Sequence, residues 1–276
     1  MVKKLIAGGC SFTFGHELSD DVTGKEPSRK SWAYGLNLTT RKPSGIANYL
    51  STYDYICTAH PGSGNSGIAR RVFNAVSKHA DKEVAGVVVM WSFTSRYDWA
   101  MPRHRMLEDT RWATISPWDT NIAAEERHKT LAGSEVQQEH WERRQKVTEI
   151  TGVKPFAEAI YRNAANDYHE TYLSWKSIIW LQNILEKKKI PFMFTLADNS
   201  LFYDKFEHLK DQDPFMSALH SEIDLTKWFS FGERMMGFNQ WSLMEEYERG
   251  TTHPLDKAHE DAVQLMLPTF KKLIGE

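Results

Sequence analysis

A serine near the start of the chain and a histidine near its end are the residue types that acyl transfer requires. Ser11 lies in the glycine-flanked segment 8–15 (GGCSFTFG), and His253 lies directly before Pro254. The glycines allow a sharp turn, which would leave Ser11 just past the strand expected before it. A hydroxyl becomes a strong nucleophile when an imidazole takes its proton. The sequence therefore predicts acyl-transfer chemistry if the fold brings Ser11 and His253 together.

Two more loops offer groups that could stabilise a negatively charged oxygen. Segment 61–66 (PGSGNS) opens an expected helix, where backbone N–H groups near Gly64 would point outward and bind an oxyanion. Ser92 and Arg96 follow an apolar run, and we assign Arg96 to substrate binding. Each loop alone is more simply explained as a turn with a capping residue. The functional interpretation depends on all of them meeting in one crevice.

Short β-prone segments alternate with helical ones along the chain. The expected strands are residues 2–7, 53–58, 85–91 and 190–196. Apolar residues recur at helical spacing in segments 65–79, 168–189 and about 256–274. Pro268 lies inside the last of these and should kink or interrupt it.

The lengths between these strands fit crossover connections, which indicates a parallel sheet with helices on both faces. Ser11, Gly64 and Ser92 would then all follow carboxyl ends of strands, the edge where open α/β sheets bind ligands. His253 lies in the loop before the closing helix and would reach the same edge.

Segment 96–163 interrupts the alternation of strands and helices. It is polar and contains four tryptophans, Trp99, Trp112, Trp118 and Trp141. Such a composition argues against a disordered linker. We expect a cap of short helices and loops over one end of the sheet, inserted into a single domain that spans residues 1–276.

Charge and cysteine content exclude several classes of protein. The chain has 34 Lys and Arg against 36 Asp and Glu, so a nucleic-acid or anionic-membrane partner is not expected. It has two cysteines and no paired CxxC spacing, and nothing completes a ligand set around His253 and His259. We therefore expect no metal and no cofactor. The apolar start is too short for a secretory signal, and no run approaches a membrane span, so a cytoplasmic location is the default.

Taken together, these motifs resemble the SGNH/GDSL hydrolase superfamily. Segment 9–13 (GCSFT) is similar to the block that carries the family's serine nucleophile, Gly64 to the block whose N–H joins the oxyanion hole, and His253 with Pro254 to the block of the catalytic histidine. The residues of segments 9–13 and 61–66 look most like those of SGNH-like proteins of bacteriophages. The resemblance implies a flavodoxin-like three-layer α/β/α domain, a serine esterase without a cofactor, and either a cytoplasmic or a virion-associated location.

The sequence departs from the family pattern at two places. The third block usually carries an asparagine that donates to the oxyanion, whereas Ser92 stands there. The acid usually lies three residues before the histidine, where this chain has Gly250, and neither Glu248 nor Asp256 has the family spacing. The acid is thus left unassigned. For the side-chain donor we consider Asn65 and Ser92. We prefer Asn65, because the hydrogens of an amide have fixed directions, whereas the hydrogen of a serine hydroxyl rotates about its C–O bond.

Two functions remain open at the level of sequence. The first is a serine esterase acting on a small acyl ester, such as an O-acetyl group on a carbohydrate. The second is a catalytically weak or inactive binding or structural module, for example a virion component that contacts other phage structural proteins. A cysteine hydrolase using Cys10 is a weaker alternative, because adjacent residues at a strand end point to opposite faces and Cys10 should then be buried.

Overall fold

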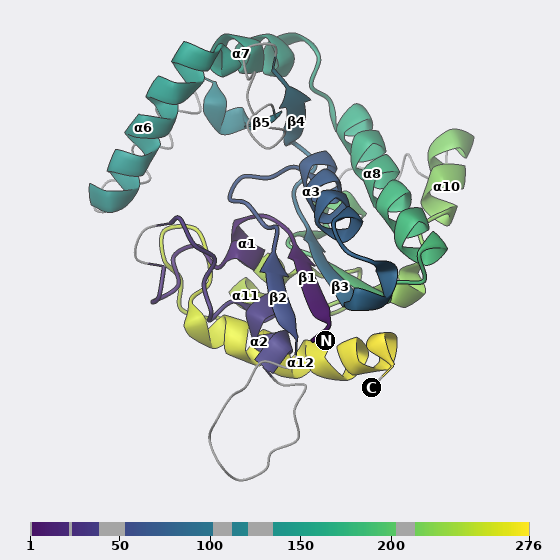
Figure 1. Cartoon of the computed structure of the whole chain (residues 1–276). Coiled ribbons are helices and arrows are strands. Elements are labelled where there is room, and N and C mark those ends of the chain that lie inside the picture. Colours follow the sequence, from purple (N-terminus) through teal and green to yellow (C-terminus); the bar gives the residue numbers. More distant parts are fainter. Residues whose placement is uncertain are drawn as a thin grey trace.

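A four-stranded parallel sheet forms the centre of the molecule (Figure 1). The computed structural model describes residues 2–21, 24–38, 53–101, 112–120, 135–202 and 213–275. The strands are β1 (Lys4–Gly8), β2 (Asp54–Cys57), β3 (Val84–Trp91) and β6 (Phe192–Leu196), hydrogen-bonded in the order β2-β1-β3-β6. The expected mixed α/β class with a parallel sheet is confirmed, and the four strands fall within the segments predicted, apart from one-residue extensions at Gly8 and Val84.

Helices cover both faces of this sheet. One face packs against α3 (Asn65–Ser77) and α8 (Asp167–Lys187), and the other packs against α2 (Trp32–Leu38), α11 (Phe238–Met244) and α12 (Asp256–Ile274). The side chains of β3 alternate between the two cores, as strand geometry requires. Val87 and Val89 contact the first core, and Val88 and Met90 contact the second.

Pro268 does not interrupt the last helix, which was one of the two effects predicted for it. Helix α12 continues from Asp256 through Pro268 to Ile274 without interruption. Pro268 lies on the exposed side of the helix, where the backbone carbonyl that loses its partner can be solvated. Met266 and Phe270, on either side of it, are fully buried and hold the helix against the sheet.

The cap also differs from the prediction of short helices and loops. The structure places two antiparallel strands there, β4 (Tyr97–Ala100) and β5 (Trp112–Ile115), followed by the long helix α6 (Glu135–Thr151) and by α7 (Val153–Asn163). Most residues of α6 are polar, so this helix lacks the apolar stripe that would have predicted it.

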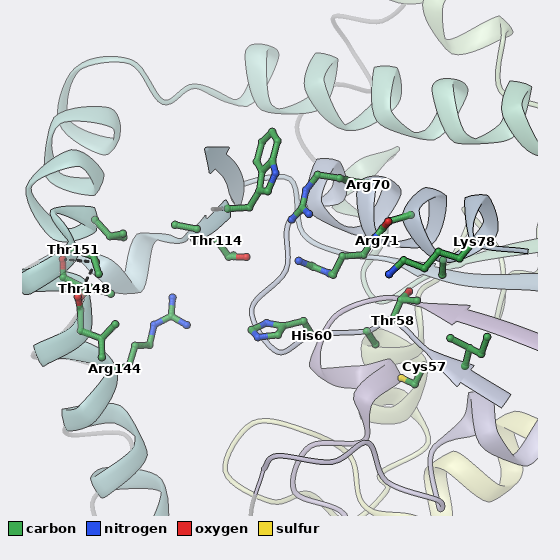
Figure 2. Close-up of a pocket in the computed structure, with 18 of the residues that line it drawn as sticks. Cys57, Thr58, His60, Arg70, Arg71, Lys78, Thr114, Arg144, Thr148 and Thr151 are labelled. Atoms are coloured by element: carbon green, nitrogen blue, oxygen red, sulfur yellow. Dashed lines mark hydrogen bonds between the residues drawn. The ribbon is translucent and has the colours of Figure 1, made fainter. Parts of the chain in front are cut away.

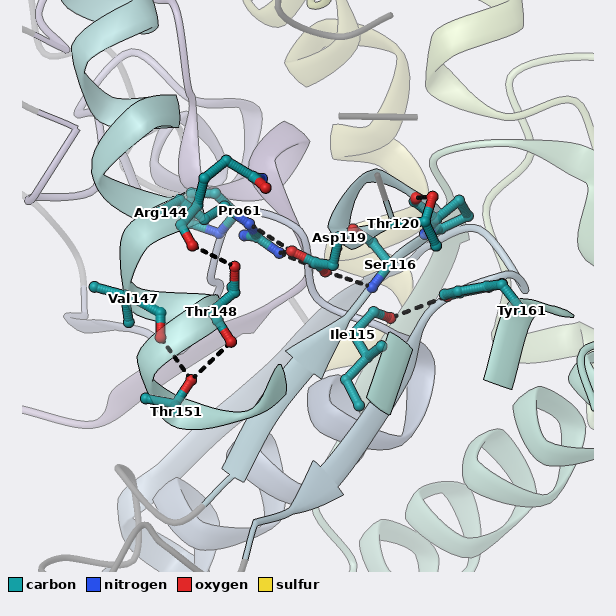
Figure 3. A network of polar contacts seen from close by, with 12 residues as sticks. Pro61, Ile115, Ser116, Asp119, Thr120, Arg144, Val147, Thr148, Thr151 and Tyr161 are labelled. Atoms are coloured by element: carbon teal, nitrogen blue, oxygen red, sulfur yellow. Dashed lines mark hydrogen bonds and ion pairs between the residues drawn. The ribbon is translucent and has the colours of Figure 1, made fainter. Parts of the chain in front are cut away.

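An ion pair with a buried carboxylate joins the parts of the cap (Figure 3). The guanidinium of Arg144 on α6 donates to the Asp119 carboxylate at 2.9 Å, and that carboxylate is fully buried. Asp119 also accepts from the backbone N–H of Ser116. From α7, the Tyr161 hydroxyl donates to the carbonyl of Ser95 at 2.6 Å. These contacts orient α6 and α7 relative to the strands that leave the sheet.

The remaining described helices are the short α1 (Ser11–Phe14) and α10 (Pro214–Ser221). Single 3₁₀ turns lie at Asp81–Glu83, Pro117–Asp119, Asn199–Leu201 and Leu225–Lys227. Among the described residues, no helix combines the length and the apolar character that crossing a bilayer would take.

Candidate active site

Ser11 is the first residue of α1 and follows β1 after a two-residue turn. The first N–H groups of a helix have no partner within it, so the N–H of Ser11 is not used by α1. Ser11 lines a cavity of about 480 Å³, whereas its neighbour Cys10 is fully buried in the core. This placement fits the expectation that the two side chains point in opposite directions.

Ser11 and His253 meet, as the sequence predicts. The Nε2 atom of His253 lies 2.7 Å from the Oγ atom of Ser11, within direct hydrogen-bond reach. His253 comes from the loop before α12, and both residues line the same cavity. The edge ring contact of His253 with Phe12, at 4.8 Å between ring centroids, packs the imidazole beside the nucleophile.

The acid behind the histidine is Glu17, which the sequence analysis did not find. Its Oε2 atom lies 3.2 Å from Nδ1 of His253 and accepts the backbone N–H groups of Thr252 at 3.0 Å and His253 at 2.9 Å. The Thr252 hydroxyl lies 2.8 Å from the same Nδ1. Ser11, His253 and Glu17 therefore form a continuous hydrogen-bonded chain.

Gly250 explains why the acid can come from this new place. A Cβ atom at Gly250 would lie 2.7 Å from Oε2 of Glu17, so any side chain there would collide with the carboxylate. Gly250 has no side chain, and the Glu17 carboxylate lies in the space that one would fill. Glu17 lies only six residues after Ser11, and this proximity to the nucleophile motif was the available signal.

Burial and hydrogen bonding set the charges of the pair. Burial raises the pKa of Glu17, but the hydrogen bond and charge of His253 and the two backbone N–H groups outweigh it and lower this pKa to about 2. Burial lowers the pKa of His253 below its usual value, and Glu17 opposes that shift. Near neutral pH, Glu17 is ionised and the imidazole is neutral, which is the state that can accept a proton from Ser11.

No protein-family model matches the chain, and a search of curated proteins gives no match either.

Asn65 and Ser92 do not face the cavity. The Asn65 amide donates to the carbonyl of Ser92 and to the Ser174 hydroxyl, both at 3.0 Å, and its oxygen accepts the Ser92 N–H at 2.7 Å. Both amide hydrogens are used, so this geometry argues against Asn65 as an oxyanion donor. The Ser92 hydroxyl is fully buried and accepts from Arg96 at 2.9 Å. Asn65 instead joins the start of α3 to the end of β3.

Gly64 holds a position next to the cavity rather than on its wall. It is the residue before α3, and a Cβ atom there would overlap the backbone carbonyl of Arg96. Gly62, two residues earlier, lines the cavity, so the loop itself does reach the site. Arg96 lines the cavity as well, with its guanidinium 4.8 Å from the centre of the Phe93 ring.

Much of the cavity wall is made of residues that were not singled out as site residues from the sequence. Trp118 and Trp141 of the cap line the same cavity as Ser11, so the insertion forms part of the site. Asn239 on α11 is the one carboxamide among the described residues that line this cavity. Its Oδ1 accepts from Arg249 at 2.9 Å, which fixes the orientation of the amide.

Three side chains at and around His253 have the composition of a cation site. His16, Glu17 and His253 each offer one ligand atom, and these atoms lie within 4.8 Å of one another. Binding a metal through His253 would break its bond to Ser11 or to Glu17, both of which have good hydrogen-bond geometry. His259, in the first turn of α12, accepts the Trp32 N–H at 3.1 Å in the core and takes no part in this group.

Proposed function

We propose that this protein is a serine esterase of the SGNH type that hydrolyses a small acyl ester. The observation that carries the proposal is the hydrogen-bonded chain from Ser11 through His253 to Glu17, with distances of 2.7 and 3.2 Å. A nucleophile, a base and an acid in series are the parts of the serine hydrolase mechanism, which recurs on unrelated folds. The strand order β2-β1-β3-β6 supports a flavodoxin-like fold, since it corresponds to the first four strands of that order.

The proposed reaction has two steps. Ser11 Oγ bonds to the acyl carbon while its proton passes to Nε2 of His253, and the resulting imidazolium is stabilised by Glu17. That proton then moves to the leaving alcohol as the ester C–O bond breaks. Water attacks the acyl-serine, His253 takes its proton and returns it to Ser11, and a carboxylic acid leaves. The Ser11 N–H and the Asn239 amide are the proposed oxyanion donors.

A saccharide scaffold suits the side chains that line the cavity. Trp118 and Trp141 supply aromatic rings, and Arg96 and Arg249 add hydrogen-bond donors. A sugar offers both an apolar ring face for stacking and hydroxyls for these donors. An O-acylated sugar is therefore the substrate class we favour.

Hydrolysis of p-nitrophenyl acetate by the purified chain tests the proposal. We expect release of p-nitrophenol by the wild type and by Ser77→Ala, an exposed serine at the far end of α3, but not by Ser11→Ala. A folded wild type that is no faster than Ser11→Ala would favour the binding-module alternative.

The pH dependence of kcat/KM follows from the lowered pKa of His253. This imidazole must be neutral to accept the Ser11 proton, and burial keeps its pKa below 6.5. Activity should therefore be full at pH 7 and fall only as the pH drops below 6.5. Rates of p-nitrophenyl acetate hydrolysis between pH 4.5 and 8 measure this limb, and a midpoint above 6.5 would contradict the assignment.

Two asparagine variants should separate a catalytic role from a structural one. Asn239→Ala is expected to lower kcat by roughly 10²- to 10³-fold, the loss typical of one oxyanion donor. Asn65→Ala leaves the buried N–H of Ser92 unsatisfied and should cost about 1–3 kcal/mol of stability. Thermal unfolding and kcat measured on both variants decide the matter. A catalytic loss in a stable Asn65→Ala protein would mean that the donors are wrongly assigned.

A further inference from the structure

A second cavity adjoins the site and has a different chemical character. Its volume is about 580 Å³, and it lies between the end of β2, helix α3 and the cap elements β5 and α6 (Figure 2). His60 and Arg144 line both this cavity and the one that contains Ser11. A ligand that extends past these two residues would therefore occupy both cavities at once.

The walls of this second cavity are cationic. Four permanently charged side chains line it, namely Arg70, Arg71, Lys78 and Arg144. In the part of the chain that the structure describes, no aspartate or glutamate lines it. Figure 2 shows Arg71 from α3 and Arg144 from α6 reaching in from opposite walls, with His60 between them.

The three arginines among these cations are held in place by side-chain contacts. Arg70 pairs with Asp98 at 2.9 Å and lies 4.6 Å over the Trp112 ring, and Arg144 is fixed by the buried Asp119. The Arg71 guanidinium donates to the Ser63 hydroxyl. A preorganised guanidinium loses little entropy when it binds an anion, so these contacts favour recognition.

The positive field reaches His60. Burial lowers the pKa of His60, and the charges of Arg71 and Arg144 lower it further. His60 is therefore neutral near pH 7. Its Nδ1 lies 2.9 Å from the Pro61 carbonyl and donates to it, which leaves Nε2 as an acceptor for a ligand hydroxyl.

We propose that this cavity is an anion subsite, and that the substrate is an acyl ester of an acidic saccharide. The carboxylate or phosphate of the saccharide would lie among Arg71, Lys78 and Arg144, while its ester reaches Ser11 through the shared wall at His60. The part concerning the ester rests on the proposed function, whereas the anion subsite can be tested by itself.

Calorimetric titration with non-reacting sugars tests the subsite. Trigalacturonate carries carboxylates, glucose 6-phosphate carries a phosphate, and maltotriose and glucose are their neutral counterparts. We expect at least one anionic sugar to bind clearly more tightly than its neutral counterpart, with an affinity that falls as salt is added. The tighter anionic sugar identifies which anion the subsite takes. Equal affinity for charged and neutral sugars would overturn the inference.

Charge-removing variants locate the subsite. Arg71→Gln should weaken binding of the preferred anion by about tenfold or more, because it removes a charge-assisted hydrogen bond. Lys78 is exposed, so Lys78→Gln should fold normally, and its affinity for the anion should fall roughly two- to fivefold. Lys272→Gln, an exposed residue of α12 on the opposite face of the sheet, is the matched control and should change nothing. Equal effects of Lys78→Gln and Lys272→Gln would contradict the location.

The two proposals fail in distinguishable ways. Anion binding that depends on Arg71, in a protein that does not cleave p-nitrophenyl acetate, would support the subsite and remove the esterase. Cleavage without preference for anionic sugars would keep the esterase and remove the subsite.

Discussion

Ser11→Ala is expected to lower kcat for ester hydrolysis by roughly 10⁴- to 10⁶-fold, the loss seen when a serine hydrolase loses its nucleophile. The variant cannot form an acyl-enzyme, so the remaining rate would come from binding and oxyanion stabilisation alone. Substrate affinity should change little, because the hydroxyl is small and its carbon atom remains. The measurement is kcat and KM for p-nitrophenyl acetate on both proteins.

A fluorophosphonate probe gives an independent reading of the same residue. It reacts with serines that an adjacent base activates, so it should label the wild type at Ser11 and leave Ser11→Ala unlabelled. His253→Ala should also abolish labelling, although Ser11 is still present. Labelling that survives in Ser11→Ala would mean that another nucleophile acts, and Cys10 is excluded from that role by its complete burial.

The positions of Ser11 and His253 were predictable because they depend on topology. Parallel strands that alternate with helices place all their carboxyl ends at one edge, and Ser11 directly follows such a strand. The alternation is strong in this sequence, since β3 is an almost continuous apolar run from Val84 to Trp91. Such regular elements determine where a loop begins, and hence which residues come near one another.

Glu17 and Asn239 were not predictable, because their roles depend on side-chain geometry within loops. Glu17 has a left-handed backbone with φ of 71°, and it reaches His253 only because Gly250 has no side chain. Asn65 illustrates the converse error. Its place beside Gly64 suggested an oxyanion donor, but the backbone of Ser92 and the Ser174 hydroxyl together use its whole amide.

The structure of the cap was difficult to predict from the sequence for a related reason. Its helix α6 is mostly polar, and it is tied to the rest of the cap by the ion pair of Arg144 with the buried Asp119, residues that lie 25 positions apart. Neither residue belongs to a recognisable pattern. The tryptophans did indicate an ordered segment, and two of them, Trp118 and Trp141, line the cavity that contains Ser11.

Glu17→Gln should give the second largest loss, a fall in kcat of about 10²- to 10⁴-fold, because a glutamine neither orients the imidazole correctly nor stabilises its cation. The pH profile should change as well. Glu17 raises the pKa of His253 against the effect of burial, so its removal lowers that pKa further. The acid limb of kcat/KM should therefore move to lower pH in the variant, a shift that a merely destabilised protein would not show.

One control variant and one variant that displaces the Glu17 carboxylate accompany Glu17→Gln. Glu248→Gln changes an exposed acid that is nearer to His253 in sequence, and it should leave kcat unchanged. Gly250→Ala keeps Glu17 but displaces its carboxylate, so it should also lower kcat.

Because the pKa of Glu17 falls from 4.5 unfolded to about 2 folded, its ionised form stabilises the protein above pH 4.5, and this contribution is lost as the pH falls toward 2. The thermal midpoint of the wild type should thus decline more steeply over that interval than the midpoint of Glu17→Gln. Parallel curves, with kcat unchanged in Glu17→Gln, would remove Glu17 from the catalytic chain.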